Sequence, residues 1–208
     1  MQSLHLNIAQ KATYYTLGNG RKLIYVLHGY GQLARFFIKK FKPLEELGFT
    51  VVAPEGSHRF YLKGTSGRVG ASWMTKENRT LDIENHVNYL KELHKTISHS
   101  QQYESIDVLG YSQGVSTAFR WLANENWLPN NLLICSGMIP PEIDLNKAPF
   151  NSINTVYFSG NEDPYREESY VQEMQQRLRE LETAEIVEFN GKHEVHIPSI
   201  LEFFKTQI

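Results

Sequence analysis

The pattern in this sequence that is tied most directly to chemistry is Gly110-Tyr111-Ser112-Gln113-Gly114. It matches G-x-S-x-G, which places a serine hydroxyl on a sharp turn between a strand and a helix. An apolar run of strand type, Ile106 to Leu109, precedes the pattern, and a stripe of helical period follows it. We therefore predict that Ser112 is a nucleophile that attacks an ester or thioester carbonyl. The competing interpretation is a binding protein whose glycines serve only the turn.

A nucleophilic serine needs a histidine base and an acid that holds the histidine in the correct tautomer. After this kind of turn they follow the serine in the order acid, then histidine, each beyond a later strand. Asp163 and His193 satisfy this order, with Glu162 as the alternative acid and His196 as the alternative base. We favour His193 because Gly191 frees the backbone of its loop, whereas His196 is expected to begin a helix.

Other residues with reactive side chains are assigned no chemistry. Asp107 falls within or at the start of a strand, and Asp144 lies in the connection before a later strand, so neither suits the acid. Cys135 sits in an apolar run and is expected to be a buried structural thiol. The pair His193 and His196 lacks the i, i+4 spacing of zinc enzymes, and no cysteine or carboxylate set completes a metal site.

Negative charge that develops on an attacked carbonyl oxygen must be stabilised by N–H donors. The backbone N–H of Gln113 is one candidate, because it lies at the start of the helix that follows Ser112. The second donor is expected in the loop Leu27 to Gln32. We choose Tyr30 there, since its two flanking glycines let its amide turn inward, and we expect His28 to be a structural residue.

The elements that would position these residues alternate along the chain. Six short runs are apolar and continuous, as strands covered on both faces should be: Lys22 to Leu27, Thr50 to Ala53, Ile106 to Leu109, Asn131 to Cys135, Thr155 to Ser159 and Glu185 to Phe189. Three stripes have helical period: Ile83, Val87, Leu90, Leu93 and Ile97; Val115, Ala118, Phe119 and Leu122; and Val171, Met174, Leu178 and Leu181. This alternation predicts an α/β fold, with a mostly parallel central sheet and helices on both faces.

Three further segments carry weaker signals. Leu4 to Leu17 is interpreted as an antiparallel hairpin at the sheet edge, and Pro198 to Thr206 as a closing helix. The region Met138 to Ile153 is too short and too rich in proline to form a cap domain. We therefore expect an open site without a lid.

Length and composition limit the classes of protein that remain. The 208 residues predict one domain, residues 1–208, and the contents of 41% hydrophobic and 21% charged residues are those of ordinary globular proteins. The formal net charge of -2 argues against nucleic acid as a partner, and no apolar run reaches the roughly 20 residues that span a bilayer. The single cysteine and the absence of signal-peptide features at the start favour a cytoplasmic location. The oligomeric state stays open between a monomer and a homodimer.

The motifs together resemble the phospholipase/carboxylesterase family of α/β-hydrolases, which includes acyl-protein thioesterases. The resemblance covers nearly the whole chain and rests on Leu27-His28-Gly29-Tyr30-Gly31, Gly110-Tyr111-Ser112-Gln113-Gly114, Ser136-Gly137-Met138-Ile139-Pro140, Asp163-Pro164 and Gly191-Lys192-His193. It implies a triad of Ser112, Asp163 and His193, oxyanion amides from Tyr30 and Gln113, and no metal or organic cofactor. The implied substrate is a small-molecule ester, with thioesters and lysophospholipids as variants. A serine peptidase is the alternative use of the same residues.

The long connection Glu55 to Arg79 follows a strand and shows no clear period, as functional loops often do. We hypothesise that its aromatic residues Phe60, Tyr61 and Trp73 line the substrate pocket. The alternative is that they pack the loop onto the body of the protein. Its basic residues outnumber its acidic ones, which would suit either an anionic substrate or a solvated loop.

Overall fold

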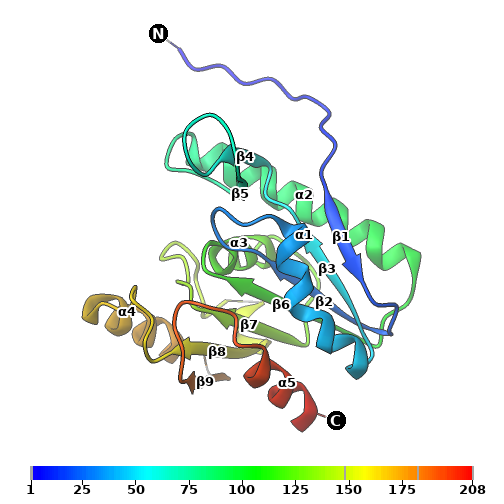
Figure 1. Ribbon diagram of the computed structural model, residues 1–208, viewed down its shortest axis with the longest axis vertical. Coiled ribbons are helices and arrows are strands. Elements are labelled where there is room, and N and C mark those ends of the chain that lie inside the picture. The colour runs from blue at the N-terminus through cyan, green and yellow to red at the C-terminus, as the bar shows by residue number, and fades with distance from the viewer. Residues whose placement is uncertain (1, 148, 182, 208) are drawn as a thin grey trace.

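A seven-stranded sheet forms the centre of the protein, in a computed structural model that describes residues 2–147, 149–181 and 183–207 (Figure 1). The strands, in their spatial order, are β1 (Tyr14–Leu17), β3 (Phe49–Pro54), β2 (Lys22–Leu27), β6 (Ser105–Tyr111), β7 (Asn131–Cys135), β8 (Asn154–Gly160) and β9 (Ala184–Phe189). Strand β1 pairs antiparallel with β3, and the other neighbours pair in parallel. The structure confirms the predicted mostly parallel sheet, flanked by helices.

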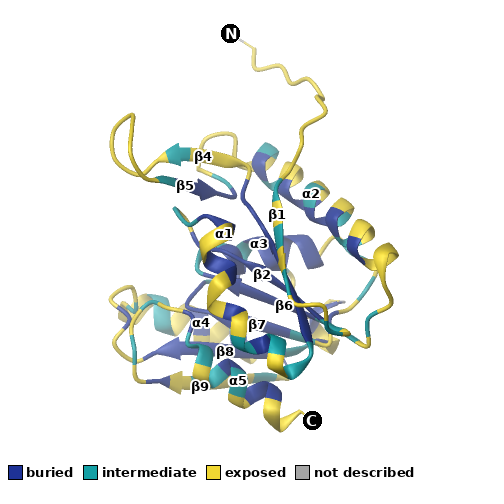
Figure 2. Cartoon of the chain, turned by 45° about the vertical axis from the view of Figure 1, so that its right-hand side comes forward, coloured by how far each residue is buried: buried dark blue, intermediate teal, exposed yellow. Residues whose placement is uncertain are grey.

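The helices cover the two faces of the sheet because the strand side chains alternate between two apolar clusters. Leu23 and Tyr25 of β2 join the cluster that contains residues of three helices, α2 (Arg79–Ser100), α3 (Gln113–Leu122) and α4 (Glu168–Arg179). Ile24 and Val26 join the opposite cluster, which contains residues of α1 (Ala34–Phe37), the 3-10 helix η1 (Ile38–Leu47) and α5 (Ile197–Thr206). The buried sheet between exposed outer helix surfaces is visible in Figure 2. The first two predicted stripes and the predicted closing helix lie in helices, and so does the third stripe except for Leu181, which follows the end of α4.

The register of the parallel strands brings the candidate site loops together at one edge of the sheet. Leu27 at the end of β2 pairs with Gly110 of β6, so the loop after β2 lies beside the turn that carries Ser112. Gly160 at the end of β8 likewise pairs with Phe189 at the end of β9. The chain departs from β2 in one direction and from β6 in the other, and such a switch point at the carboxyl ends of strands is where open α/β sheets bind ligands.

The predicted hairpin at the N-terminus is wrong in part. Only Tyr14–Leu17 forms a strand, which is antiparallel and at the sheet edge as expected. The chain from residue 2 to residue 13 has no regular secondary structure, and Leu4 and Leu6 are each 85% exposed. Among the described residues, 2–13 contain no strand that could form a hairpin with Tyr14–Leu17, which pairs with β3 instead.

The connection from Glu55 to Arg79 contains an element that its sequence did not indicate. Strands β4 (His58–Tyr61) and β5 (Val69–Ser72) form an antiparallel hairpin that stands above α1 in Figure 1. Residues of β4 are mostly exposed, so the strand carries no alternation of buried and exposed residues that a sequence pattern could reveal. The backbone of Ala71 pairs with that of Gln32, which fastens the hairpin to the loop after β2.

The described residues of the connection between β7 and β8 hold only the 3-10 helix η2 (Phe150–Ser152), so no cap domain is inserted there. Within the described residues, no helix combines the length and the apolar character needed to cross a bilayer.

Candidate active site

Ser112 occupies a strained turn between β6 and α3. Its φ of 52° and ψ of -116° lie in a region that residues other than glycine rarely adopt, at a cost of about 1–3 kcal/mol. Packing of neighbouring backbone against the turn holds this conformation. A Cβ on Gly137 would come within 2.6 Å of the Ser112 carbonyl oxygen, and one on Gly29 within 3.1 Å of the Ser112 Cβ. The approach at Gly137 therefore requires glycine, whereas a larger residue at Gly29 would need the Tyr111 ring and Ser112 to shift by a few tenths of an ångström.

His193 lies between Ser112 and Asp163 and contacts both. The His193 Nε2 is 3.0 Å from the Ser112 Oγ, and the His193 Nδ1 is 2.7 Å from Asp163 Oδ2. A carboxylate only accepts hydrogen bonds, so the His193 proton belongs on Nδ1, and Nε2 is left to accept the serine hydroxyl. The structure thus brings together the three residues that the sequence selected, with the geometry of a nucleophile, a base and an orienting acid.

The backbone and rings around His193 fix its position. The Tyr111 hydroxyl donates to the His193 carbonyl oxygen at 2.7 Å, and burial raises the pKa of Tyr111 to about 12, so this donor stays protonated. The Tyr165 ring packs edge-on against the imidazole, with ring centroids 4.7 Å apart. The Tyr165 amide also donates to Asp163 Oδ1 at 2.9 Å, so both carboxylate oxygens are engaged. Sequence reasoning did not assign Tyr111 or Tyr165, although Tyr111 is the first variable residue of the G-x-S-x-G pattern.

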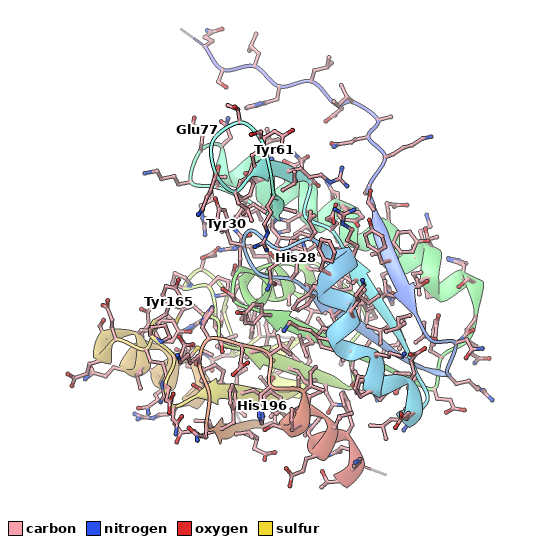
Figure 3. The ribbon with its side chains drawn as sticks, viewed as in Figure 1. His28, Tyr30, Tyr61, Glu77, Tyr165 and His196 are labelled. Carbon is pink, nitrogen blue, oxygen red and sulfur yellow. The ribbon has the colours of Figure 1, made fainter. Side chains whose placement is uncertain are left out.

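Among the described residues, no side-chain hydrogen bond joins Ser112 or His193 to the alternative acid, to the alternative base or to the two rejected acids. Glu162 is exposed, and Asp144 forms a surface ion pair with Lys147 at 2.9 Å. Asp107 is buried within β6, where burial raises its pKa to about 6 and the Asn131 amide donates to it. His196 stacks on Phe189 with ring centroids 4.4 Å apart, and its label in Figure 3 lies beside α5, away from that of Tyr30.

Two backbone amides beside Ser112 have no acceptor in the described part of the chain: those of Tyr30 and Gln113. The Gln113 amide is the first of α3, where the helix dipole favours negative charge. The loop that contains Tyr30 is held by His28, whose Nε2 accepts the Gly56 amide at 2.9 Å while its Nδ1 donates to the Gly29 carbonyl at 2.8 Å. Burial lowers the pKa of His28, so its neutral form fits both bonds. Free N–H donors of this kind can stabilise an oxyanion.

One segment, Ala71 to Met74, binds both amide-bearing loops. The Gly31 amide donates to the Ala71 carbonyl at 2.8 Å, on the side of Tyr30. On the other side, the Gln113 side chain accepts the Trp73 amide at 3.0 Å and donates to the Met74 carbonyl at 2.8 Å. We call this second set of bonds the Gln113 clamp. These bonds were not visible in the sequence, because they join residues about 40 positions apart.

The three aromatic residues that the sequence offered as pocket-lining are placed differently from one another. Phe60 is partly buried, with its ring 5.0 Å from that of Tyr30, and Tyr61 is 48% exposed on the hairpin (Figure 3). Trp73 is only 1% exposed, and its indole N–H donates to the His28 carbonyl at 2.9 Å. The placement of Trp73 fits the alternative interpretation, that it packs the connection onto the body of the protein.

Among the described residues, no group of three or more His, Cys, Asp or Glu is arranged to hold a metal ion. Cys135 is fully buried, and burial raises the pKa of its thiol well above the ordinary range. This burial agrees with the structural role expected for that thiol.

Comparisons with known proteins give one family and a consistent fold. A family model described as Phospholipase/Carboxylesterase matches residues 16–208. A carboxylesterase from Mesorhizobium loti has a similar structure, with a TM-score of 0.73 and 15% identity over 94% of each chain. Esterase PE8 gives 0.71 and 18%, and acyl-protein thioesterase 2 from Zea mays gives 0.69 and 16%; each covers 95% of this chain and 98% of its own. At these identities the likeness concerns the fold alone. No curated protein sequence matches the chain.

Proposed function

This chain belongs to the phospholipase/carboxylesterase family, as its motifs predicted, and we propose that it hydrolyses small carboxylic esters through an acyl-Ser112 intermediate. The observation that carries the proposal is the continuous contact from the Ser112 Oγ through His193 to Asp163. Family membership makes the protein a hydrolase of the esterase and thioesterase type. The arrangement of these side chains supports the serine mechanism.

The first half-reaction forms the acyl-enzyme. The Ser112 Oγ attacks the ester carbonyl carbon while its proton passes to the His193 Nε2, 3.0 Å away. The carbonyl oxygen becomes an oxyanion that accepts hydrogen bonds from the Tyr30 and Gln113 amides. The carbon–oxygen bond to the alcohol then breaks, and the alcohol oxygen takes the proton from His193 as it leaves. Between these two steps His193 is an imidazolium, and the Asp163 carboxylate stabilises its positive charge and keeps its orientation.

The second half-reaction returns the enzyme to its starting state. His193 removes a proton from a water molecule, whose oxygen attacks the acyl carbon, and the same two amides hold the second oxyanion. The bond from the acyl carbon to the Ser112 Oγ breaks, and His193 returns the proton to that oxygen. A carboxylic acid is released. Substrates that differ only in the atom leaving the acyl carbon, such as thioesters, would follow the same steps.

Covalent labelling tests the proposed nucleophile. The Ser112 Oγ is expected to attack the phosphorus of a fluorophosphonate probe, with its proton passing to His193 and fluoride leaving to solvent. The phosphonyl group that remains on the peptide carrying Ser112 is detected by mass spectrometry. Ser112→Ala should not be labelled, whereas Ser116→Ala, one turn along the same helix, should be labelled like the parent. Hydrolysis of 4-nitrophenyl acetate is measured on the same samples. Labelling on another residue would refute the assignment, and absence of both labelling and hydrolysis would favour a binding protein.

The Gln113 clamp predicts a positioning effect that is distinct from stability. Gln113→Ala keeps the backbone amide but removes its attachment to residues 72–74, and we expect kcat for 4-nitrophenyl acetate to fall about tenfold with less change in KM. Gln113→Glu can still accept the Trp73 amide and should recover part of the loss. The matched control is Gln101→Ala, whose side chain donates to the Gly20 carbonyl, away from the site loops.

The melting temperature of each variant is measured together with its kinetics. A lower melting temperature with an unchanged kcat for Gln113→Ala would mean that the clamp stabilises the fold and does not position the amide.

A further inference from the structure

A groove of about 540 Å³ lies beside the loop that carries the Tyr30 amide. Gly31 and Gln32, the two residues after Tyr30, form its floor on the side of the site. One wall comes from α1 and the start of η1, and the other from the end of the β4–β5 hairpin (Figure 1). The groove therefore begins at the residue that follows Tyr30 in the chain. We call it the α1–hairpin groove.

The charged side chains that line the groove all have the same sign. They are Arg35 and Lys40 on one wall and Arg68 on the other, and no aspartate or glutamate lines it. All three are exposed. The chain as a whole carries a formal net charge of -2, so this concentration of positive charge does not follow from composition. A cleft lined by one sign of charge attracts ligands of the opposite sign.

The three groove cations also have no ionic partner, which among the other arginines of the described chain is true of Arg179 alone. Arg35, Lys40 and Arg68 form no ion pair with any described carboxylate. Six arginines elsewhere do so: Arg21, Arg59, Arg79, Arg120, Arg166 and Arg177. Two of them, Arg59 and Arg79, belong to the same connection as Arg68, but Glu55 and Glu142 neutralise them. The positive charge left over in this connection therefore includes Arg68 at the groove.

The groove also offers apolar surface next to its charges. Phe36 on α1 is 57% exposed, and the Arg35 guanidinium lies 4.7 Å from the centre of its ring. On the opposite side, the partly buried Val69 of β5 lines the groove, and Leu62, which is 39% exposed, lies against Gly31. Surfaces of this kind suit a ligand with a short carbon skeleton that ends in an anionic group.

We propose that the α1–hairpin groove binds an anionic group of the substrate, so that the preferred substrates are esters that carry a carboxylate or phosphate a few atoms from the scissile bond. The proposal rests on the proposed function, because it places the reacting carbonyl at Ser112. Arg68 and Arg35 supply paired N–H donors from opposite walls, and Lys40 supplies a third positive charge. A bound anion would supply an ionic partner to cations that have none within the described chain.

A pair of matched esters tests the proposal on the acyl side. Mono-4-nitrophenyl glutarate and 4-nitrophenyl pentanoate have the same number of acyl carbons and the same leaving group, and they differ in a terminal carboxylate. The measured quantity is the selectivity, defined as kcat/KM for the anionic ester divided by that for the neutral ester. The 4-nitrophenyl monoesters of succinate and adipate, compared with their neutral counterparts, vary the distance between the carboxylate and the ester carbonyl. We expect the selectivity of Arg68→Gln to be about fivefold lower than that of the parent. The selectivity of the triple variant Arg35→Gln/Lys40→Gln/Arg68→Gln should be lower still.

A second pair places the charge on the alcohol side: 4-acetoxybenzoate and 4-methylphenyl acetate. Loss of selectivity in the groove variants with one pair and not the other identifies which half of the substrate enters the groove. Either result supports the proposal. Arg179→Gln removes an exposed arginine at the end of α4 that does not line the groove, and its selectivity should stay within about twofold of the parent. Raising the salt concentration should reduce the selectivity of the parent more than that of the triple variant.

The outcomes separate this proposal from the proposed function. If the neutral esters are hydrolysed but the groove variants keep the parental selectivity for both pairs, the groove does not bind the anion and the esterase mechanism stands. If Arg179→Gln lowers selectivity as much as Arg68→Gln, the effect is one of overall charge, and the proposal that the groove binds the anion is again refuted. If the parent hydrolyses none of these esters, the proposed function fails and this inference fails with it.

Discussion

Replacement of His193 by alanine is expected to lower kcat for 4-nitrophenyl ester hydrolysis by at least about 10,000-fold, because among the described residues no other side chain is hydrogen-bonded to the Ser112 Oγ. The distance of 3.0 Å between the His193 Nε2 and the Ser112 Oγ is the basis of this expectation. Single-turnover measurements with 4-nitrophenyl acetate would show the loss in the acylation step. The residual rate then reports what the Tyr30 and Gln113 amides contribute without a base.

His196→Ala is the matched control, since it removes a histidine three residues away. His196 bonds to Ser199 and stacks on Phe189, so its loss should reduce stability by about 1 kcal/mol and change kcat by less than about threefold. A large loss of activity in His196→Ala, with His193→Ala still active, would reverse the assignment of the base. Equal losses in both, with normal melting temperatures, would require a proton path that involves both rings.

Asp163→Asn is expected to lower kcat by about 10,000-fold while leaving the fold intact. The carboxylate accepts two hydrogen bonds, from the His193 Nδ1 and from the Tyr165 amide. An asparagine has one oxygen for these two donors. If that oxygen faces Tyr165, the amide NH₂ donates to the His193 Nδ1, which places the histidine proton on Nε2, where it cannot accept the serine proton. If the oxygen faces His193, the NH₂ group faces the Tyr165 N–H, so two donors lie against each other and the Tyr165 amide loses its acceptor.

Glu162→Gln supplies the comparison for this variant. It makes the same chemical change one residue earlier, on an exposed side chain, and kcat should remain within about twofold of the parent. The steady-state kinetics of the two variants are measured with one ester. An active Asp163→Asn together with an inactive Glu162→Gln would show that the neighbouring glutamate orients the base.

The parts of the fold that could be predicted are the elements in which burial on both sides restricts the residue types to apolar ones. Strands β2, β7 and β8 are covered on both faces, so successive residues within them are largely apolar and their positions were predictable. The β4–β5 hairpin could not be predicted, because its first strand is largely exposed and its short pairing leaves no period in the sequence. The antiparallel edge strand β1 was anticipated, but its partner was placed in the preceding residues, when β3 supplies it.

The same distinction applies to the candidate site. Chain order and the G-x-S-x-G turn selected Ser112, Asp163 and His193, and the structure places them in contact, although their catalytic roles stay a proposal. Hydrogen bonds between side chains and backbone that are distant in the sequence, such as those of the Gln113 clamp, could not be predicted from a sequence pattern. The connection from Glu55 to Arg79 shows this for charge as well. Its excess of basic residues was evident, but the partner of Arg79 is Glu142, 63 residues away, so only the structure separates paired from unpaired cations.

The attachment of both amide-bearing loops to Ala71 to Met74 has a consequence for how proteins of this design diverge. Residues 62–68, at the end of the hairpin, lie outside these attachments, so insertions there can reshape the surface over the substrate while the amides stay in place. An insertion between Ala71 and Met74 would shift both amides at once. The hairpin thus divides into an end that can vary and a base that cannot, which lets substrate preference change without rebuilding the catalytic machinery.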